Sequence, residues 1–305
     1  MDKPFKTIDE QIAILEARGM EVGASAYEAL SREGYYSVVN GYKDLFLDAR
    51  QSREKGSDVY KEGTRFDDLY RVFEFDRDLR LVMFRYFSMA EAVLKTVCSY
   101  NFTQVHVNEK ESYLDRRNYR SDRGYPERVD RLIRDFESAL GKDPRKPPRR
   151  KAYLDHYRDN HDEVPLWVLL RYMTLGQTFK FFEFQNDSMR NAMAKNFSEL
   201  YAQTYGCPRK IYDRDIRLAF DHIKDFRNIC AHDERLYCAR VSPSHSVSVW
   251  DVVSDLGLVL PKDEHARMLK EIESLLRGVL ESLDGEACLG IVSSMGVDLK
   301  GGAFS

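Results

Sequence analysis

Hydrophobic residues recur at intervals of three and four along much of this chain, the spacing that places side chains on one face of an α-helix. The longest such run has neither proline nor glycine inside it and comprises Phe66, Leu69, Phe73, Leu79, Met83, Tyr86, Ala90, Val93 and Val97. Because nothing in this run breaks a helix, we predict one long helix over about residues 65–100.

Boundary residues indicate four further helical segments. Pro126 suits a first helical turn and Gly141 a helix end, so the residues between them are expected to be helical. Residues 165–176 predict an apolar helix that begins at the proline and runs toward the glycine. The Cys207-Pro208 pair interrupts the chain before another helix, and residues 262–283 return to helical spacing.

A β pattern is weak and local. Val241 to Val249 could form a strand or a hairpin, although serine and proline weaken the pattern. Since helical signals dominate elsewhere, and we find neither an internal repeat nor a low-complexity segment, the sequence predicts an all-α fold.

Composition narrows the class of protein. In 305 residues, 43% are hydrophobic and 32% charged, and no uninterrupted apolar run approaches the roughly 20 residues of a membrane helix. The first residues lack the apolar segment of a secretory signal. Five scattered cysteines without a CxxC pair fit reduced thiols better than a disulfide scaffold or a structural zinc site. We therefore expect a cytoplasmic protein with no membrane partner, no metal and no cofactor.

The formal net charge of −3 averages over regions of opposite sign. Arginines are frequent between Arg116 and Arg134, and a proline-rich basic segment from Lys142 to Arg150 follows as an expected exposed loop. The candidate RNA-binding residues in and next to this segment are Arg145, Lys146, Arg149, Arg150 and Lys151. Local charge steers a polyanion, so this sector is compatible with RNA, and equally with a solvated helix face and loop.

The candidate chemistry lies in the segment Arg227-Asn228-Ile229-Cys230-Ala231-His232. A guanidinium grips phosphate through a planar fork of donors, and an imidazole exchanges protons near neutral pH. Asn228, His232 and Arg235 share one helix face, and Arg235 is a further candidate for binding RNA. On a straight helix, Arg227 and His232 would diverge by about 140°. They can meet at one phosphate only if the helix ends or bends between them, or if a second copy completes the site, which indicates a homodimer.

Four blocks of this chain resemble the AbiD/AbiF-like group of abortive-infection proteins, a bacterial phage-defence family, over roughly residues 1–240. The blocks are Gly34 to Tyr42; Phe66 to Arg80, continued by Glu91 and Lys95; Leu175 to Thr178 after Trp167; and Arg227-Asn228 with Ala231-His232 and Arg235-Leu236. The resemblance implies a helical domain over residues 1–240, with residues 241–305 as a helical extension packed on the same body.

That family is related to the HEPN superfamily of helical-bundle ribonucleases, so the resemblance implies metal-independent RNA cleavage by a site shared between two protomers. Arg227 and His232 match the motif positions, and Asn228 matches its frequent polar second position. The chain departs from the pattern at Asp233-Glu234, where the family often has an imidazole or a neutral residue, and at Tyr237-Cys238, where tryptophan-asparagine is common.

Several residues allow simpler interpretations. His232 could cap a helix end, and Glu91 could form a surface ion pair with Lys95 instead of orienting Arg227. Four aromatic side chains could stack on bases or belong to the core, and they stay unassigned: Tyr35, Tyr36, Trp167 and Phe179. The remaining histidines show no metal-ligand spacing.

Three functions are compatible with these residues. The first is a defence ribonuclease that cuts cellular or phage RNA. The second is a non-catalytic RNA-binding or dimerisation protein, held for example by a cognate small RNA. The third is a HEPN toxin controlled by a nucleotidyltransferase antitoxin, a type that usually carries a tyrosine closer to the histidine than Tyr237 is to His232.

Overall fold

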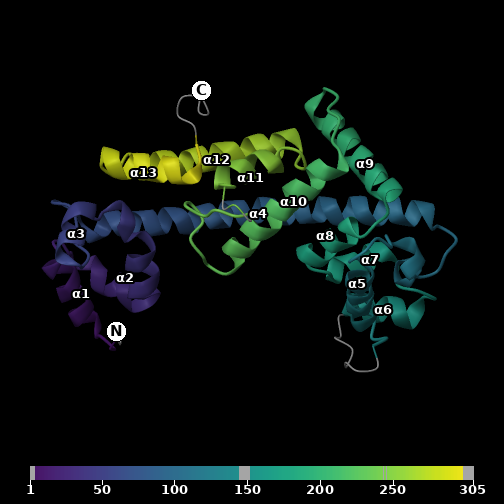
Figure 1. Cartoon of the computed structure of the whole chain (residues 1–305), viewed down its shortest axis with the longest axis horizontal. Helices are drawn as coiled ribbons and strands as arrows, with labels where there is room; N and C mark the ends of the chain where they lie inside the picture. The colour runs from purple at the N-terminus through teal and green to yellow at the C-terminus, as the bar shows by residue number, and fades with distance from the viewer. Residues whose placement is uncertain (1–3, 144–151, 243, 245, 298–305) are drawn as a thin grey trace. The chain divides into compact units, whose positions relative to one another are not determined.

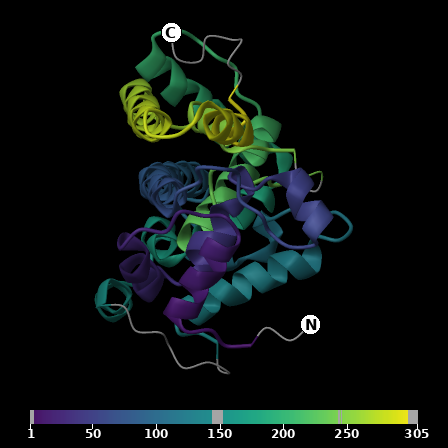
Figure 2. The same ribbon diagram turned by 90° about the vertical axis from the view of Figure 1, so that its left-hand side faces the viewer.

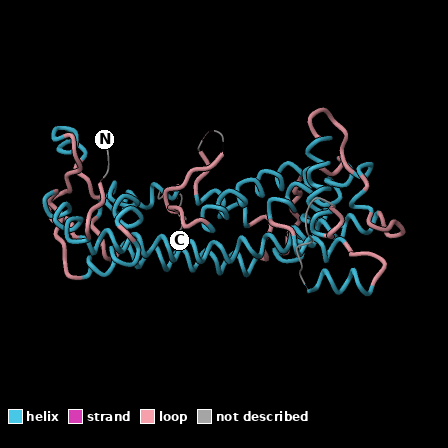
Figure 3. Tube along the Cα trace, turned by 90° about the horizontal axis from the view of Figure 1, so that it is seen from below, coloured by secondary structure: helices cyan, strands magenta, loops and turns pink. Residues whose placement is uncertain are grey.

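The computed structural model describes residues 4–143, 152–242, 244 and 246–297. Helices joined by loops and turns make up these residues, and the β pairing among them is limited to isolated bridges (Figures 1 and 3). The all-α fold predicted from the spacing of hydrophobic residues is confirmed. The HEPN-like arrangement of the bundle stays a prediction.

Two compact units make up the chain. The first holds the described residues of Met1–Phe84, Asn228–Asp251 and Arg267–Ser305, and the second holds those of Arg85–Arg227 and Val252–Ala266. Each unit is therefore assembled from segments that lie far apart in the sequence. The predicted boundary after residue 240 stays a prediction.

The longest helix, α4, covers Phe66–Val105 and belongs to the first unit as far as Phe84. It confirms the helix predicted over about residues 65–100, and it continues to Val105. Leu69, Leu79 and Met83 are fully buried, as the spacing of apolar residues requires.

Short helices build the N-terminal part of the first unit. They are α1 (Ile8–Ala17), α2 (Ser25–Glu33), the π-helix η1 (Tyr36–Asn40), the 3-10 helix η2 (Lys43–Leu45) and α3 (Ala49–Lys55). Thr7 and Glu10 form a capping box at the start of α1. The Glu21 backbone N–H donates to the Thr64 carbonyl at 2.8 Å, so the chain after α1 is bonded to the segment just before α4. Figure 1 shows α1, α2 and α3 grouped at this end of α4.

The C-terminal part of the described chain contains α11 (Val249–Leu256), α12 (Lys262–Leu280) and α13 (Gly285–Met295). The helix predicted over residues 262–283 is confirmed, with its end at Leu280. Asp284 caps α13 by accepting the Ala287 N–H at 2.8 Å. Figure 2 shows α12 and α13, at the yellow end of the colour range, as neighbouring helices.

The strand or hairpin predicted over Val241–Val249 is wrong for the described residues of that segment, which exclude positions 243 and 245. Val241 and Val247 exchange backbone hydrogen bonds of 3.0 and 3.3 Å as an isolated bridge, and α11 begins at Val249. The Ser248 N–H and hydroxyl both donate to Asp251, and the Asp251 N–H returns a bond to the Ser248 hydroxyl. These reciprocal bonds start a helix where the valines would otherwise extend a strand.

The second unit contains α5 (Pro126–Ala139), α6 (Ala152–Asn160), α7 (Leu166–Tyr172), α8 (Leu175–Glu183) and α9 (Asp187–Tyr205). The helix predicted from Pro126 to Gly141 is confirmed, because proline occupies the first turn of α5 and Gly141 takes φ +71° just beyond its end. α5 packs against α7 and α8. In the core, the ring of Phe181 lies 5.2 Å from Phe102 and 6.0 Å from Phe136, measured between centroids.

The single helix predicted over residues 165–176 is wrong, because two helices occupy this segment. α7 ends at Tyr172, Met173 is extended, and α8 starts at Leu175 with Gly176 inside it. Thr174 and Gln177 form a capping box at this start. A Thr-x-x-Gln sequence therefore begins a new helix, and the glycine toward which the predicted helix runs lies in the first turn of α8.

The remaining α-helix, α10, covers Asp213–Ala231 and follows the helix interruption predicted at Cys207-Pro208. On this helix the apolar residues Ile216, Ala219, Ile223 and Phe226 recur at intervals of three and four and are fully buried, whereas Cys230, four residues further along, is half-buried. No helix in the described part of the chain is both long and apolar enough to cross a membrane.

Candidate functional site

The end of α10 creates an unusual turn at the motif. The helix ends at Ala231, and the His232 N–H makes the last helical bond, to the Asn228 carbonyl at 3.0 Å. Asp233 then takes φ +56°, the left-handed region, and the Glu234 N–H closes the turn on the Ile229 carbonyl at 3.1 Å. This is the bonding pattern of a Schellman-type helix end, with aspartate at the position that glycine usually occupies. His232 therefore stands where the helix gives way to the following loop.

A buried carboxylate holds that loop in place. Asp76 of α4 is fully buried and accepts the Tyr42 hydroxyl at 2.7 Å, the Tyr237 N–H at 2.7 Å and the Leu236 N–H at 3.1 Å. Arg80 donates to the same carboxylate at 2.8 Å. The Asp76 side chain thus accepts hydrogen bonds from two backbone N–H groups of the loop after α10. Without it, these buried N–H groups would lack partners.

Arg80 fixes the turn itself. Its side chain is 5% exposed, and it contacts Asp76, the Asp233 carboxylate at 2.5 Å and the Glu234 carbonyl at 3.4 Å. Because a non-glycine residue at positive φ costs free energy, the Arg80–Asp233 ion pair offsets part of the strain at Asp233. The acid that departs from the family pattern is therefore engaged with α4.

Burial shifts the titration of this network. It raises the pKa of the Asp76 carboxyl, and the hydrogen bonds from Tyr42 and Tyr237 and the charge of Arg80 act in the opposite direction. Burial, followed by the nearby Asp76 charge, also raises the pKa of Tyr42 well above its ordinary range. The Tyr42 hydroxyl therefore stays a hydrogen-bond donor at neutral pH. The Tyr42 ring stacks beside the Tyr237 ring, with 5.9 Å between the ring centroids.

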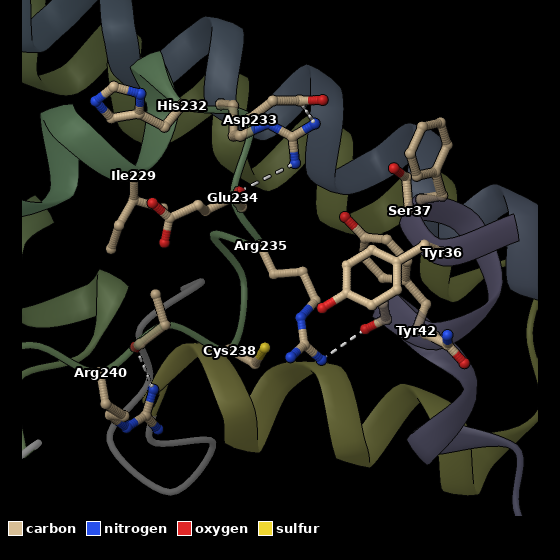
Figure 4. A pocket seen from close by; sticks show the side chains of 15 residues that line it. Tyr36, Ser37, Tyr42, Ile229, His232, Asp233, Glu234, Arg235, Cys238 and Arg240 are labelled. Atoms are coloured by element: carbon tan, nitrogen blue, oxygen red, sulfur yellow. Dashed lines mark hydrogen bonds and ion pairs between the residues drawn. The ribbon is translucent and has the colours of Figure 1, made fainter. Parts of the chain in front are cut away.

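A pocket of about 590 Å³ opens above this network, within the first unit (Figure 4). It is lined by η1 and the residues after it, by Phe73 and Arg80 of α4, and by the end of α10 with the following loop. The residues are Tyr36, Ser37, Asn40, Gly41, Tyr42, Phe73, Arg80, Ile229, His232, Asp233, Glu234, Arg235, Cys238, Ala239 and Arg240. Three of the four sequence blocks therefore contribute to one cavity.

The groups that a ligand would meet are cationic, acidic, aromatic and polar, since the exposed residues Asp233 and Glu234 also line the pocket. His232 and Arg235 are exposed, and the Arg235 guanidinium donates to the Gly41 carbonyl at 2.7 Å. Figure 4 shows Arg235 extending toward Tyr36, a residue that is 78% exposed. Arg240, which donates to the Ser294 carbonyl, adds a second guanidinium. The pocket combines an imidazole, a group that can exchange protons, with two guanidinium groups, a type that can bind phosphate, and an exposed tyrosine.

The other predicted site residues lie as follows. Arg227 is half-buried on α10, in the second unit, whereas Asn228 is exposed at the start of the first unit's share of that helix. Glu91 pairs with Lys95 at 2.7 Å, and neither side chain is more than 18% exposed, so this is not an open surface pair. The candidate RNA-binding residues Arg145, Lys146, Arg149, Arg150 and Lys151 lie outside the described residues.

The unassigned aromatic residues separate clearly. Phe179 is 3% exposed and belongs to the core, and Tyr35 is half-buried. Trp167 is 51% exposed on α7 and does not line the pocket. Tyr36 is therefore the member of this group that a ligand in the pocket would meet.

The sequence pointed to His232 and Arg235 as site residues, but it did not show that Asn40 and Arg80 line the same pocket or that Asp76 supports it. Asp76 carried a usable signal, because it follows Phe73 by three residues and precedes Leu79 by three, on the buried face of the helix. An acid in a buried stripe needs partners, so its presence predicts a polar network. The backbone groups that it binds, 160 and more positions away, carry no such signal.

Comparison with known proteins identifies the family. The model of the family described as Abi-like protein matches residues 28–238, which include all four blocks. The chain belongs to this family. Its membership indicates a role in abortive infection, a phage-defence response. No curated protein and no solved structure matched the chain.

Proposed function

We propose that this Abi-like protein is a metal-independent endoribonuclease of the HEPN type. The observation that carries the proposal is the exposed His232, which lines a pocket of about 590 Å³ together with Arg235 and Tyr36. A histidine that serves only as a helix cap has no need of such surroundings. Phosphate-binding and base-stacking groups next to an imidazole suit a ribonucleotide.

The proposed chemistry uses the RNA's own 2′-hydroxyl. His232 takes the proton from this hydroxyl as general base, or returns a proton to the leaving 5′-oxygen as general acid. Arg227 stabilises the charge that builds on the phosphoryl oxygens, and Asn228 orients the imidazole or the ribose. Arg235 binds a neighbouring phosphate. The products are a 2′,3′-cyclic phosphate and a 5′-hydroxyl, and DNA is not cut, because it has no 2′-hydroxyl.

A homodimer is part of this proposal. Arg227 and His232 leave a straight helix in directions about 140° apart. Because α10 ends at Ala231, His232 lies just beyond the helix. In a dimer, one protomer would supply Arg227 and the other His232. Light scattering at micromolar concentration tests this, since an active monomer would remove the need for a shared site.

The decisive experiment is an RNA-cleavage assay of the full chain in EDTA beside its His232→Ala variant, with the product ends identified. We expect cyclic-phosphate ends from the wild type and almost no cleavage by the variant. Strict dependence on magnesium, 5′-phosphate products or an unchanged variant would each contradict the proposal. Equal RNA binding by both proteins, with no cleavage by either, would instead support a non-catalytic RNA-binding protein.

The alternative function, a HEPN toxin controlled by a nucleotidyltransferase antitoxin, has less support than the ribonuclease. A tyrosine that receives a nucleotidyl group must present its hydroxyl to the modifying enzyme. Tyr237 is 4% exposed and stacks beside Tyr42. Mass spectrometry of the protein purified from its own host tests this reading, because a nucleotide adduct on Tyr237 would restore it.

A further inference from the structure

A second cavity lies in the second unit, in the elbow between α9 and α10, which comprises residues 206–212. It measures about 670 Å³ and opens between one face of α9 and the segment that leads into α10. Its lining residues are Asn191, Ala194, Lys195, Ser198, Glu199, Ala202, Pro208, Arg209, Lys210, Ile211 and Tyr212. None of them belongs to the pocket around His232.

Small side chains create the floor of this trough. Ala194, Ser198 and Ala202 follow one another at intervals of four on α9, so they form one row along the helix. Where a row of leucines would fill the space up to the elbow, alanine and serine leave it open. The floor is a narrow, largely apolar strip.

The trough is formed by well-anchored backbone. Ile211 is 3% exposed, and its N–H donates to the Ser198 hydroxyl at 2.9 Å. Arg190, at the start of α9, donates to the Gln185 carbonyl at 2.6 Å and to Asp213 of α10 at 3.2 Å. A ligand would therefore enter a cavity that exists before binding, which limits the entropy lost on association.

Cations lie beside tyrosine rings at this cavity and next to it. The Lys210 ammonium and the Arg214 guanidinium lie 4.8 and 5.0 Å from the ring centroid of Tyr212, which is 42% exposed. The Arg209 guanidinium lies 5.6 Å from the ring of Tyr201. These spacings are those of cation–π contacts, and they hold positive charge directly beside aromatic faces.

The charge at the rim is positive on balance. Two carboxylates pair with cations next to them: Glu199 with Lys195 at 3.6 Å and Asp215 with Arg214 at 3.6 Å. Within the described part of the chain, neither Arg209 nor Lys210 forms an ion pair. Both side chains are exposed, so their charges are available to an anionic partner.

We propose that the α9–α10 elbow is a binding site for single-stranded RNA, separate from the pocket around His232. This proposal rests on the proposed function, because it assumes that the elbow binds the same RNA that is cut at His232. Arg209 and Lys210 contact phosphates, an unstacked base takes the place of one of the two cations beside the Tyr212 ring, and the apolar floor receives the edge of that base. Cations beside aromatic rings fit a polyanion with unpaired bases, because a double strand keeps its bases stacked inside.

The test uses the full-length chain and a short fluorescein-labelled 2′-O-methyl oligouridine. This probe has no free 2′-hydroxyl, so it reports binding by fluorescence anisotropy without cleavage. We expect Tyr212→Ala to weaken binding about 10-fold and Tyr212→Phe to retain it, because the ring supplies the stacking face. In the double variant Arg209→Gln, Lys210→Gln, the slope of log affinity against log salt should become shallower by about 1.4, as expected for two phosphate contacts.

Matched controls come from the same unit. Arg171→Gln with Lys180→Gln makes an equal change in charge at two other exposed positions, and Tyr100→Ala removes another tyrosine, which is 61% exposed. These controls should bind the probe as the wild type does. Circular dichroism of every variant separates a loss of contact from a loss of fold.

The outcomes distinguish this inference from the proposed nuclease. Elbow variants that bind like the wild type, or controls that lose as much affinity, overturn the elbow as a site while leaving cleavage at His232 untouched. A protein that cuts no RNA yet loses affinity in the elbow variants overturns the nuclease and keeps the elbow. A labelled acidic peptide that competes fully with the oligonucleotide, with equal loss in the elbow variants, overturns RNA as the occupant.

Discussion

The pocket after α10 and the α9–α10 elbow are both open cavities bordered by arginine and tyrosine, but they are built in opposite ways. The pocket rests on a buried ionic network, in which Asp76 and Arg80 hold a turn with a left-handed aspartate. The elbow rests on a row of small side chains and a buried isoleucine. Single groups in the pocket have defined positions, as proton transfer requires, whereas the elbow offers faces and charges that tolerate many ligand geometries.

This difference predicts that changes in the two regions affect separate steps. The pocket should determine whether RNA is cut, and the elbow how tightly it is held.

The largest expected effect is on cleavage. His232→Ala should lower the single-turnover rate at saturating RNA about 10²- to 10⁴-fold, because a proton-transfer group is lost. The double variant Arg209→Gln, Lys210→Gln should cut saturating RNA at the wild-type rate but require more protein to reach saturation. Single-turnover kinetics measures both quantities, and a double variant that slows the saturated rate as strongly would erase the proposed separation.

The next effect is on the stability of the network under the pocket. Asp76→Ala should lower the free energy of unfolding by about 3–5 kcal/mol, because Arg80 and two backbone N–H groups lose a buried partner. Asp78→Ala, two positions along the same helix and exposed, should change it by less than about 0.5 kcal/mol. Urea denaturation followed by circular dichroism gives both values, and similar values would show that the Asp76 network contributes little.

A smaller effect is expected in the elbow. Ser198→Ala should cost about 1–3 kcal/mol, since the Ile211 N–H loses its acceptor, and it should also weaken RNA binding. Ser188→Ala, at an exposed position near the start of α9, is the control and should be neutral in both assays. Thermal melts and anisotropy measure the pair, and a destabilised Ser198→Ala with full RNA affinity would show that the fixed backbone is not needed for binding.

The smallest expected effect is a dependence of stability on pH that arises away from the pocket. Burial lowers the pKa of His265, whose ring bonds to the Val253 carbonyl at 3.0 Å in the second unit. The unfolded chain therefore takes up the proton at a higher pH than the folded chain. This contribution to stability is complete above the ordinary histidine pKa of about 6.5, and it is lost as the pH falls through the lower pKa of the folded state.

His265→Gln should flatten that decline between neutral and mildly acidic pH. Denaturation of both proteins at several pH values measures the difference. An equal decline in both would show that His265 is not the source of the sensitivity.

The class of fold and the long helix that begins at Phe66 could both be predicted from the chain alone. These follow from the spacing of apolar residues and the absence of breakers, which act over one or two helical turns. Capping sequences explain the two wrong predictions, the single helix over residues 165–176 and the strand or hairpin over Val241–Val249, which fail at Thr174 and Ser248. There a short capping sequence outweighed a hydrophobic pattern that extended across it. The choice of His232 and Arg235 likewise came from their types and spacing.

The surroundings of those two residues depend on contacts between distant segments. The pocket joins the segment around Tyr36 to the loop around Arg235, which donates to a carbonyl 194 positions away. The carboxylate of Asp76 meets backbone groups at the far end of the motif block, and α4 and α10 each belong to two compact units. Such contacts depend on how helices pack, and packing is set by the combined shape of many side chains. No periodicity in a single stretch of sequence encodes it.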